Sequence, residues 1–118
     1  MELERYLIKK GKSDLLSSLK ALDKDLLKEK MKEKDIDNIE ELKEDIIDKF
    51  DMCLDNSKED IFTVMYFKKI VEHQDSIFLS AYKQDIDALW VFIYRNGNHY
   101  SYYIPTEIRG IIRKYLKF

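Results

Sequence analysis

The segment WVFIYRNGNHYSYY, residues 90–103, decides how the second half of the chain folds. Two runs rich in aromatic and β-branched side chains flank the pair Asn96-Gly97, which is the strongest short-range signal for a β-hairpin. Asn and Gly favour this turn because both of its central residues require positive φ. The expected cross-strand pairs are Tyr94 with His99 and Phe92 with Ser101.

Helical periodicity surrounds the hairpin on both sides. Apolar side chains recur at spacings of three and four residues, as on one face of an amphipathic helix. The segments with this spacing are 3–8, 15–22, 26–31, 39–54, 61–71 and 108–116, with short helical turns at 77–82 and 86–89. Segment 61–71 is apolar on almost every side, which predicts a central, buried helix. The expected N-caps are Ser13, Asp23, Asn38 and Ser57 with Asp60.

The composition favours a helical protein. Gly and Pro together number only four of 118 residues, which argues against an all-β or loop-rich fold. Charged residues make up 37%, well above the usual level of about 25%, and the exposed sides of amphipathic helices can accommodate them. We therefore expect an α+β fold that is mostly α and contains one β-hairpin.

Two parts of the chain resemble known modules. From residue 58 onward, the order of helix, short helices, hairpin and final helix resembles a winged-helix module, with the hairpin as its wing. Residues 12–50 are similar to the helix, extended loop and helix of SAP-like modules and of the N-terminal module of Rho termination factors. This likeness rests on LKAL at 19–22, DLLKEK at 25–30, Ile36, and IEELKEDII at 39–47. The chain departs from the SAP-like pattern at residues 35–37, which are acidic where a small, basic connection is typical.

The two resemblances predict the organisation of the chain. An N-terminal helical bundle, residues 1–56, packs on a winged-helix-like unit, residues 57–118, in one continuous core. Several uncharacterised proteins of low-GC bacteria look like this combination. The excess of Lys over Arg, with many Ile, Asp and Tyr, also indicates an AT-rich coding sequence, from such a bacterium or its phage.

Charge is unevenly distributed, although the whole chain carries only −2. Residues 35–60 have a net charge of −8, whereas residues 1–34 and 61–118 each have a net charge of +3. The single cysteine, Cys53, excludes an intramolecular disulfide and fits a reducing compartment. No apolar run is long enough to span a bilayer and no signal-peptide pattern is present, so we expect a cytoplasmic protein without a membrane partner.

Nucleic-acid binding is the first functional hypothesis, as a DNA-associated or transcription-related accessory protein. An arginine at the tip of a wing can reach a phosphate or the minor groove. The competing interpretation is that the same charges only solvate helix ends and a hairpin edge. The candidate residues are Lys68, Lys69, Arg95, Asn96, Arg109, Arg113 and Lys114.

Protein binding is the second hypothesis, for example as a phage-encoded inhibitor, an adaptor or a homodimer. Both faces of the expected hairpin are apolar, so one of them is available to a partner. The acidic block could instead imitate the charge of nucleic acid, although screening limits its reach to about 8 Å at physiological salt. The alternative for the aromatic side chains is that they pack the hairpin into the core, and the alternative for the acidic block is that it is an ordinary solvated helix face. The candidate residues are Glu40, Glu44, Trp90, Tyr94, Tyr100 and Tyr102.

Catalytic motifs are lacking. The sequence contains no HExxH, CxxC, GxSxG or glycine-rich phosphate loop. Cys53 falls on the apolar stripe of its helix, where we expect a small buried hydrophobe rather than a nucleophile. Glu72, His73 and Asp75 lack the second cluster that a metal site would need. We expect neither enzymatic activity nor a cofactor.

Overall fold

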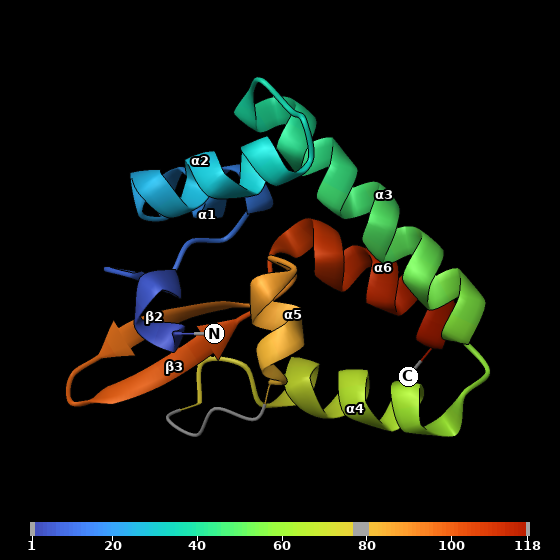
Figure 1. The fold of residues 1–118 in the computed structure, drawn as a ribbon. Coiled ribbons are helices and arrows are strands. Elements are labelled where there is room, and N and C mark those ends of the chain that lie inside the picture. Colours follow the sequence, from blue (N-terminus) through green and yellow to red (C-terminus); the bar gives the residue numbers. More distant parts are fainter. Residues whose placement is uncertain (1, 77–80, 118) are drawn as a thin grey trace.

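A computed structural model describes residues 2–76 and 81–117 and confirms an α+β fold that is mostly α-helical (Figure 1). Its helices are η1, a 3-10 helix (Leu3–Tyr6), α1 (Leu15–Ala21), α2 (Lys24–Glu33), α3 (Ile39–Ser57), α4 (Ile61–Glu72), α5 (Lys83–Asp87) and α6 (Thr106–Leu116). Its strands are β1 (Leu7–Ile8), β2 (Phe92–Asn96) and β3 (His99–Tyr103). Residues 77–80 of the turn expected at 77–82 lie outside the described residues, and helix α5 ends before most of the turn expected at 86–89.

Side-chain caps start the first four α-helices. Asp23 and Asn38 accept hydrogen bonds from backbone N–H groups of α2 and α3 at 3.0 and 2.9 Å, as the sequence predicted. The cap of α1 is Asp14 rather than Ser13, because its carboxylate accepts the N–H three residues ahead at 3.0 Å. Asp60 alone caps α4, since α3 continues to residue 57.

The N-terminal segment adds a strand to the hairpin. A helix over residues 3–8 was expected, but only the 3-10 turn η1 forms there. Leu7 and Ile8 then pair in parallel with Ile93 and Tyr94 of β2, giving the strand order β1-β2-β3. The hairpin explains this outcome, because β2 offers an unpaired edge whose backbone groups need partners.

The hairpin forms, but its register differs from the expected one. Strand β2 extends to Asn96 and pairs with His99, so that Tyr94 faces Ser101 and the two-residue turn is Gly97-Asn98. Gly97 has φ +62°, whereas φ of Asn98 is not positive. Positive φ at the first central residue alone is typical of a type II′ turn, which favours Gly at that position. The pairing moves by two residues, so each side chain keeps its predicted face.

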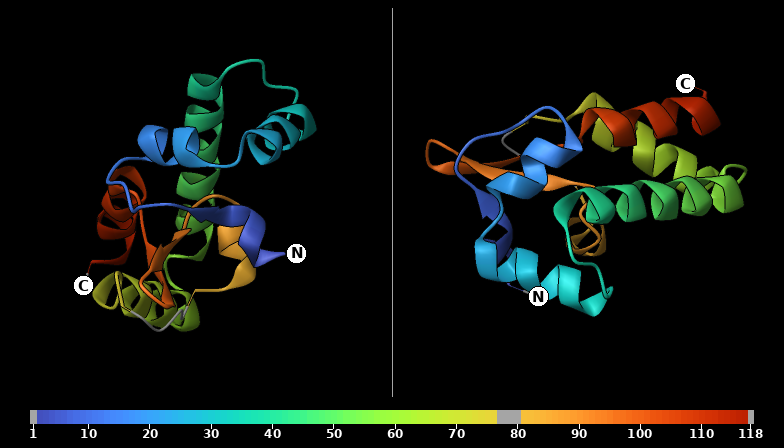
Figure 2. Two further views of the ribbon diagram at one scale, coloured as in Figure 1. Left: turned by 90° about the vertical axis from the view of Figure 1, so that its left-hand side faces the viewer. Right: turned by 90° about the horizontal axis from the view of Figure 1, so that it is seen from above.

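Helices cover both faces of the sheet (Figure 2). On one face, the Tyr103 hydroxyl forms a 2.7 Å hydrogen bond with Ser18 of α1. On the other, the Tyr102 hydroxyl donates to the backbone oxygen of Ile70 in α4 at 3.0 Å, and burial raises the pKa of Tyr102 to about 12. The hairpin is therefore a packed layer and exposes little of its aromatic surface.

One hydrophobic core connects both halves of the chain. Its fully buried members come from α1, α2, α3, α4, the sheet and α6, and α3 runs beside α6 (Figure 1). They include Leu15, Leu19, Leu26, Leu42, Ile46, Phe50, Leu54, Ile70, Ile93, Tyr102 and Ile112. The boundary between residues 1–56 and 57–118 stays a prediction.

Helix α4 is not the central helix that its sequence suggested. Only Phe67 and Ile70 of this helix are buried, whereas Ile61, Phe62 and Met65 are exposed. The helix lies at the edge of the molecule and packs through one side only (Figure 1). Its other apolar side is left without a covering element among the described residues.

An ion pair between a buried lysine and a half-exposed aspartate joins α2 to α5. Lys30 is only 7% exposed and donates to the Asp87 carboxylate at 2.7 Å and to the Asp87 backbone oxygen at 2.9 Å. The Tyr6 hydroxyl also donates to this carboxylate. Hydrogen bonds from Lys30 and Tyr6 lower the pKa of Asp87, so the folded state favours the ionised form.

Asp87→Asn is expected to lower the free energy of unfolding by about 1–2 kcal/mol at pH 7, a range that allows for solvent screening of the half-exposed carboxylate. Since folding lowers the pKa of Asp87, its contribution is present above the pKa of the unfolded chain and is lost as pH falls through the folded value. Chemical denaturation at pH 7 and near pH 2 measures both. This role would be contradicted if the free energies of unfolding of wild type and variant differed by the same amount at both pH values.

Candidate functional site

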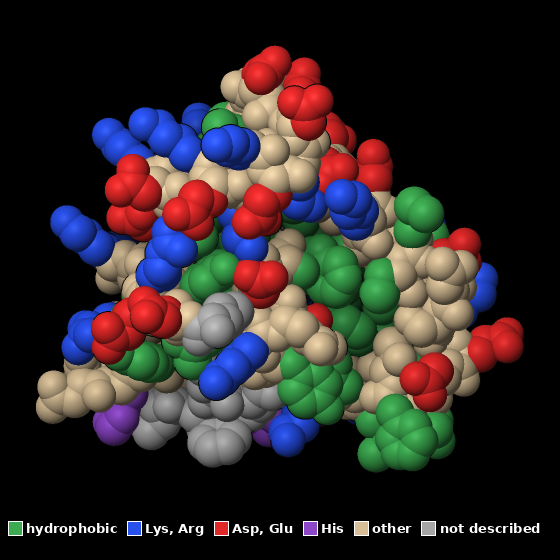
Figure 3. Space-filling view, in the orientation of Figure 1, with side chains coloured by type: hydrophobic (Ala, Val, Ile, Leu, Met, Phe, Trp, Pro, Cys, Tyr) green, Lys and Arg blue, Asp and Glu red, His purple; other side chains and the backbone are tan. Residues whose placement is uncertain are grey.

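The largest exposed apolar side chains lie on α3, α4 and the start of α5. Ile61, Phe62 and Met65 on α4 are 65%, 77% and 60% exposed, which is unusual for side chains of this size. Met52 on α3 and Tyr82, the residue before α5, are exposed as well. We call Ile61, Phe62, Met65 and Tyr82 the apolar face. In Figure 3, apolar side chains gather in the region of α3, α4 and α5, and acidic side chains follow α3 beside them.

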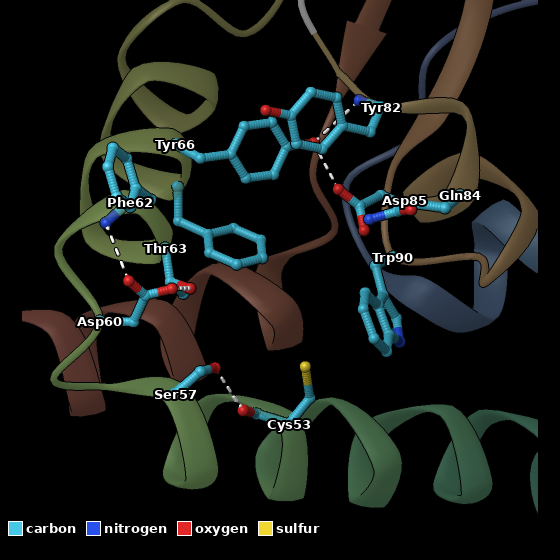
Figure 4. A pocket seen from close by; sticks show the side chains of 11 residues that line it. Cys53, Ser57, Asp60, Phe62, Thr63, Tyr66, Tyr82, Gln84, Asp85 and Trp90 are labelled. Carbon is cyan, nitrogen blue, oxygen red and sulfur yellow. Dashed lines mark hydrogen bonds between the residues drawn. The ribbon is translucent and has the colours of Figure 1, made fainter.

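A hollow of about 250 Å³ adjoins the apolar face, and two residues of this face, Phe62 and Tyr82, are among its lining residues. Figure 4 shows Cys53 of α3 directed into it from one side, with Tyr66 and Tyr82 along another side and Trp90 opposite, whereas Phe62 lies at its margin on α4. Its volume lies below the roughly 300–1,000 Å³ of typical small-molecule sites. The hollow therefore suits a single side chain of a larger partner better than a cofactor.

A hydrogen-bonded group of two tyrosines and an aspartate forms one wall of the hollow. Tyr66 donates its hydroxyl to the Asp85 carboxylate and accepts the backbone N–H of Tyr82 at 2.9 Å. The rings of Tyr66 and Tyr82 are stacked, with centroids 4.2 Å apart and planes 6° apart. This arrangement fixes the side chains that surround the carboxylate.

Asp85 is a buried carboxylate. The residue is only 4% exposed. None of the described Lys, Arg or His residues forms an ion pair with its carboxylate. Burial raises the pKa of Asp85, and the hydrogen bond from Tyr66 offsets this only in part. Burial also raises the pKa of Tyr66 well above its ordinary value. The folded protein therefore bears a cost for keeping Asp85 ionised.

Asp85→Asn is expected to leave the free energy of unfolding unchanged at pH 7 or to raise it by about 1 kcal/mol. The amide can still accept from Tyr66, and it carries no charge to desolvate. Since folding raises the pKa of Asp85, the wild type loses stability relative to the variant as pH rises through the folded value. Thermal and chemical denaturation between pH 3 and 8 measure this difference. A variant that is clearly less stable than wild type at pH 7 would contradict it.

Cys53 is exposed rather than buried, which corrects the sequence-based prediction. It lies on α3 where the helix borders the hollow, and no element covers it fully. Burial by its neighbours, with the Asp85 charge as a second cause, raises the pKa of the thiol. A raised pKa keeps the thiol protonated, so the position does not favour nucleophilic chemistry.

The predicted nucleic-acid-binding residues are distributed over three elements. Lys68 and Lys69 are exposed on α4, and Arg95 and Asn96 are exposed at the end of β2. The Arg95 guanidinium lies 5.4 Å from the centre of the Tyr100 ring. On α6, Arg113 is exposed, Lys114 forms an ion pair with Asp51 at 3.5 Å, and Arg109 is half-buried and donates to Thr106 at 3.3 Å.

The predicted protein-binding residues have different environments. Glu40 and Glu44 are exposed in the first half of α3. Trp90 is half-buried at the hollow, and Tyr94 and Tyr100 are half-buried on the hairpin. Tyr102 is fully buried, so it cannot meet a partner on the surface and its assignment as a binding residue was wrong. Its ring packs toward α4 because the sheet is covered on that face as well.

Sequence reasoning missed Ile61, Phe62, Met65 and Asp85. A signal for the first three was present, because segment 61–71 is apolar on almost every side. A helix that packs through one side only exposes the remainder of such a surface. The sequence held no comparable signal for Asp85, since its burial depends on Tyr66 from another helix.

Neither a metal site nor a membrane span is found in residues 2–76 and 81–117. No group of three or more His, Cys, Asp or Glu side chains there could hold a metal ion, and Glu72, His73 and Asp75 do not form one. None of the helices in these ranges combines the length and apolar character that crossing a bilayer requires.

Comparison with known proteins leaves the chain without an assigned family. No protein-family model matches it, and the searches of curated proteins and of solved structures return no significant match. The likenesses to SAP-like modules, to the N-terminal module of Rho termination factors and to winged-helix modules therefore stay predictions.

Proposed function

We propose that the protein works without catalysis, by binding another protein through the apolar face. The observation that carries this proposal is the exposure of Ile61, Phe62 and Met65 side by side on one helix, next to a hollow. Exposed apolar clusters with a polar surround are typical of protein-interaction sites. Partner binding would remove this surface from water and would thereby supply the driving force for association.

The residue types of the apolar face support the proposal. Aromatic side chains and methionine are enriched at interfaces, whereas charged side chains are depleted at their centres. Methionine adapts its shape to a partner because it is unbranched and flexible, and Met65 is exposed on α4 three residues after the exposed Phe62. Trp90 and Tyr82 add the aromatic groups that often dominate binding energy.

The double substitution Phe62→Ser with Met65→Ser is expected to abolish partner binding without unfolding the protein. Both side chains are already exposed, so their replacement removes little from the core. The test is selection of a random peptide-display library of about 16 residues on the immobilised wild type and on this variant. Peptides should be enriched on the wild type and lost on the variant. The matched control, Arg95→Ala with Arg113→Ala, should retain them.

The reverse pattern would contradict the proposal. Peptides that bind wild type and the Phe62/Met65 variant equally well would place binding elsewhere. A library that yields no more peptides on the wild type than on the variant would also contradict the proposal. Circular dichroism of both proteins establishes that each variant keeps its fold.

Nucleic-acid binding is a second candidate function. It is supported by the exposure of Lys68, Lys69, Arg95 and Arg113, none of which forms an ion pair within the described residues. Titration of labelled duplex and single-stranded DNA at several salt concentrations tests it. A saturable signal whose salt dependence indicates several displaced phosphates would support this candidate. Absence of binding at low salt would exclude it.

A further inference from the structure

The charge that lines the hollow is all of one sign. Asp60 and Asp85 are the only Asp, Glu, Lys, Arg or His side chains among its described lining residues. The charge of the neighbouring sequence has the same sign, since residues 35–60, which include α3, carry a net charge of −8. The hollow is therefore acidic and is bordered by the acidic helix α3, and this limits which partners fit it.

We propose that the partner places a Lys or Arg side chain in the hollow, toward Asp85, and that apolar side chains on either side of this residue cover Phe62 and Met65. This inference rests on the proposed function and specifies the chemistry of its partner. The occupant is a basic segment of another protein with apolar residues next to the cation.

The shape of the hollow fits a long cationic side chain. Lys and Arg have apolar stems, which would pass between the aromatic side chains of Tyr66, Phe67 and Trp90. Arg also stacks favourably on aromatic rings. Asp85 then forms a charge-assisted hydrogen bond with the cation, which compensates the buried carboxylate that the free protein leaves without an ion pair.

The same charges disfavour the other occupants. A phosphate group or an acidic peptide would approach Asp60 and Asp85 with like charge and would be repelled. A second copy of the chain in a two-fold symmetric dimer would bring the acidic hollows of the two copies close to each other. A basic partner instead gains from long-range attraction by α3 during association.

The test uses the peptides enriched on the wild type. We expect them to contain a Lys or Arg flanked by apolar residues. Fluorescence anisotropy then compares one such peptide with its analogue in which the cation is replaced by Gln, on wild type and on Asp85→Asn. The basic peptide should bind Asp85→Asn about tenfold more weakly than wild type, because a charge-assisted bond is lost. The Gln analogue should bind the two proteins equally.

The control is Asp37→Asn, which removes one exposed carboxylate from the connection before α3 and should leave the affinity for the basic peptide within about twofold. If Asp85→Asn proved unstable, the affinities of the basic peptide and its Gln analogue for the wild type would still show whether the cation contributes to binding. The inference would be overturned by enriched peptides without a cation, by equal binding of the Gln analogue and the basic peptide, or by self-association through Phe62. In the first two cases the proposed function would stand. Absence of any enrichment that depends on Phe62 and Met65 would refute both.

Discussion

Phe50→Ala is expected to lower the free energy of unfolding by about 3–5 kcal/mol. Phe50 is fully buried at the middle of α3. Its ring contacts Phe67 edge-on, with centroids 5.5 Å apart, and Trp90 at 4.7 Å. Truncation to alanine removes the transfer free energy of the ring and leaves a cavity between α3 and α4. Chemical denaturation of the variant measures the loss.

Phe50→Leu serves as the matched control for this prediction. It retains most of the buried volume and should cost clearly less than the alanine substitution. Because Phe67 and Trp90 also line the hollow, Phe50→Ala should weaken binding of the basic peptide in addition to lowering stability. A loss of less than 1 kcal/mol in the free energy of unfolding would contradict the role of Phe50 in packing the core against the wall of the hollow.

Tyr102→Ala is expected to destabilise the protein by a similar amount, about 3–5 kcal/mol. Tyr102 is fully buried on β3, and its hydroxyl donates to Ile70 across the interface between the sheet and α4. The substitution removes both the ring and this bond. Tyr102→Phe removes the bond alone and should cost about 1 kcal/mol.

These two variants separate a structural role of Tyr102 from a binding role. A structural residue lowers the midpoint of thermal unfolding, and peptide binding at temperatures where the variant is folded should stay close to that of wild type. Loss of peptide binding by Tyr102→Phe with unchanged stability would contradict the structural role.

Local signals in the sequence predicted a large part of the fold. Asp23 and Asn38 cap helices where the sequence indicated, and Gly97 supplies the positive φ that a tight hairpin turn needs. These features depend on a few neighbouring residues, so they can be recognised without knowing the tertiary structure. The mostly helical α+β class followed from the same local patterns.

Two errors were local, namely the cap of α1 and the register of the hairpin, but most concern contacts between distant segments. Leu7 and Ile8 became a strand because β2, more than 80 residues later, offered a free edge. The same dependence on distant partners explains the exposure of Cys53 and the burial of Tyr102. Periodicity shows which side chains are apolar, but it does not show which of them find a covering element.

The candidate site was predictable only in part. Protein binding was among the hypotheses, and Trp90 was among its residues, but the apolar face itself was not predicted. The apolar character of segment 61–71 was interpreted as evidence of burial. The structure shows that only Phe67 and Ile70 are fully buried, and the exposed side chains Ile61, Phe62 and Met65 belong to the candidate site.

Ionised Asp85 is expected to lower the stability of the free protein and to raise its affinity for a basic partner. A buried carboxylate without an ion pair costs folding free energy, and an incoming cation recovers it. Natural proteins commonly give up stability at residues that serve function. The Asp85→Asn variant should therefore be at least as stable as the wild type and yet bind the basic peptide more weakly.

Hydrogen–deuterium exchange of the protein with and without a peptide enriched on the wild type tests the central claim most directly. Binding at the apolar face predicts slower exchange of backbone amides in residues 61–66 and 82–85, with little change at the hairpin tip, residues 95–99. Slower exchange at the hairpin tip or at residues 40–48, with none in residues 61–66, would contradict the claim and would place the binding site elsewhere on the molecule.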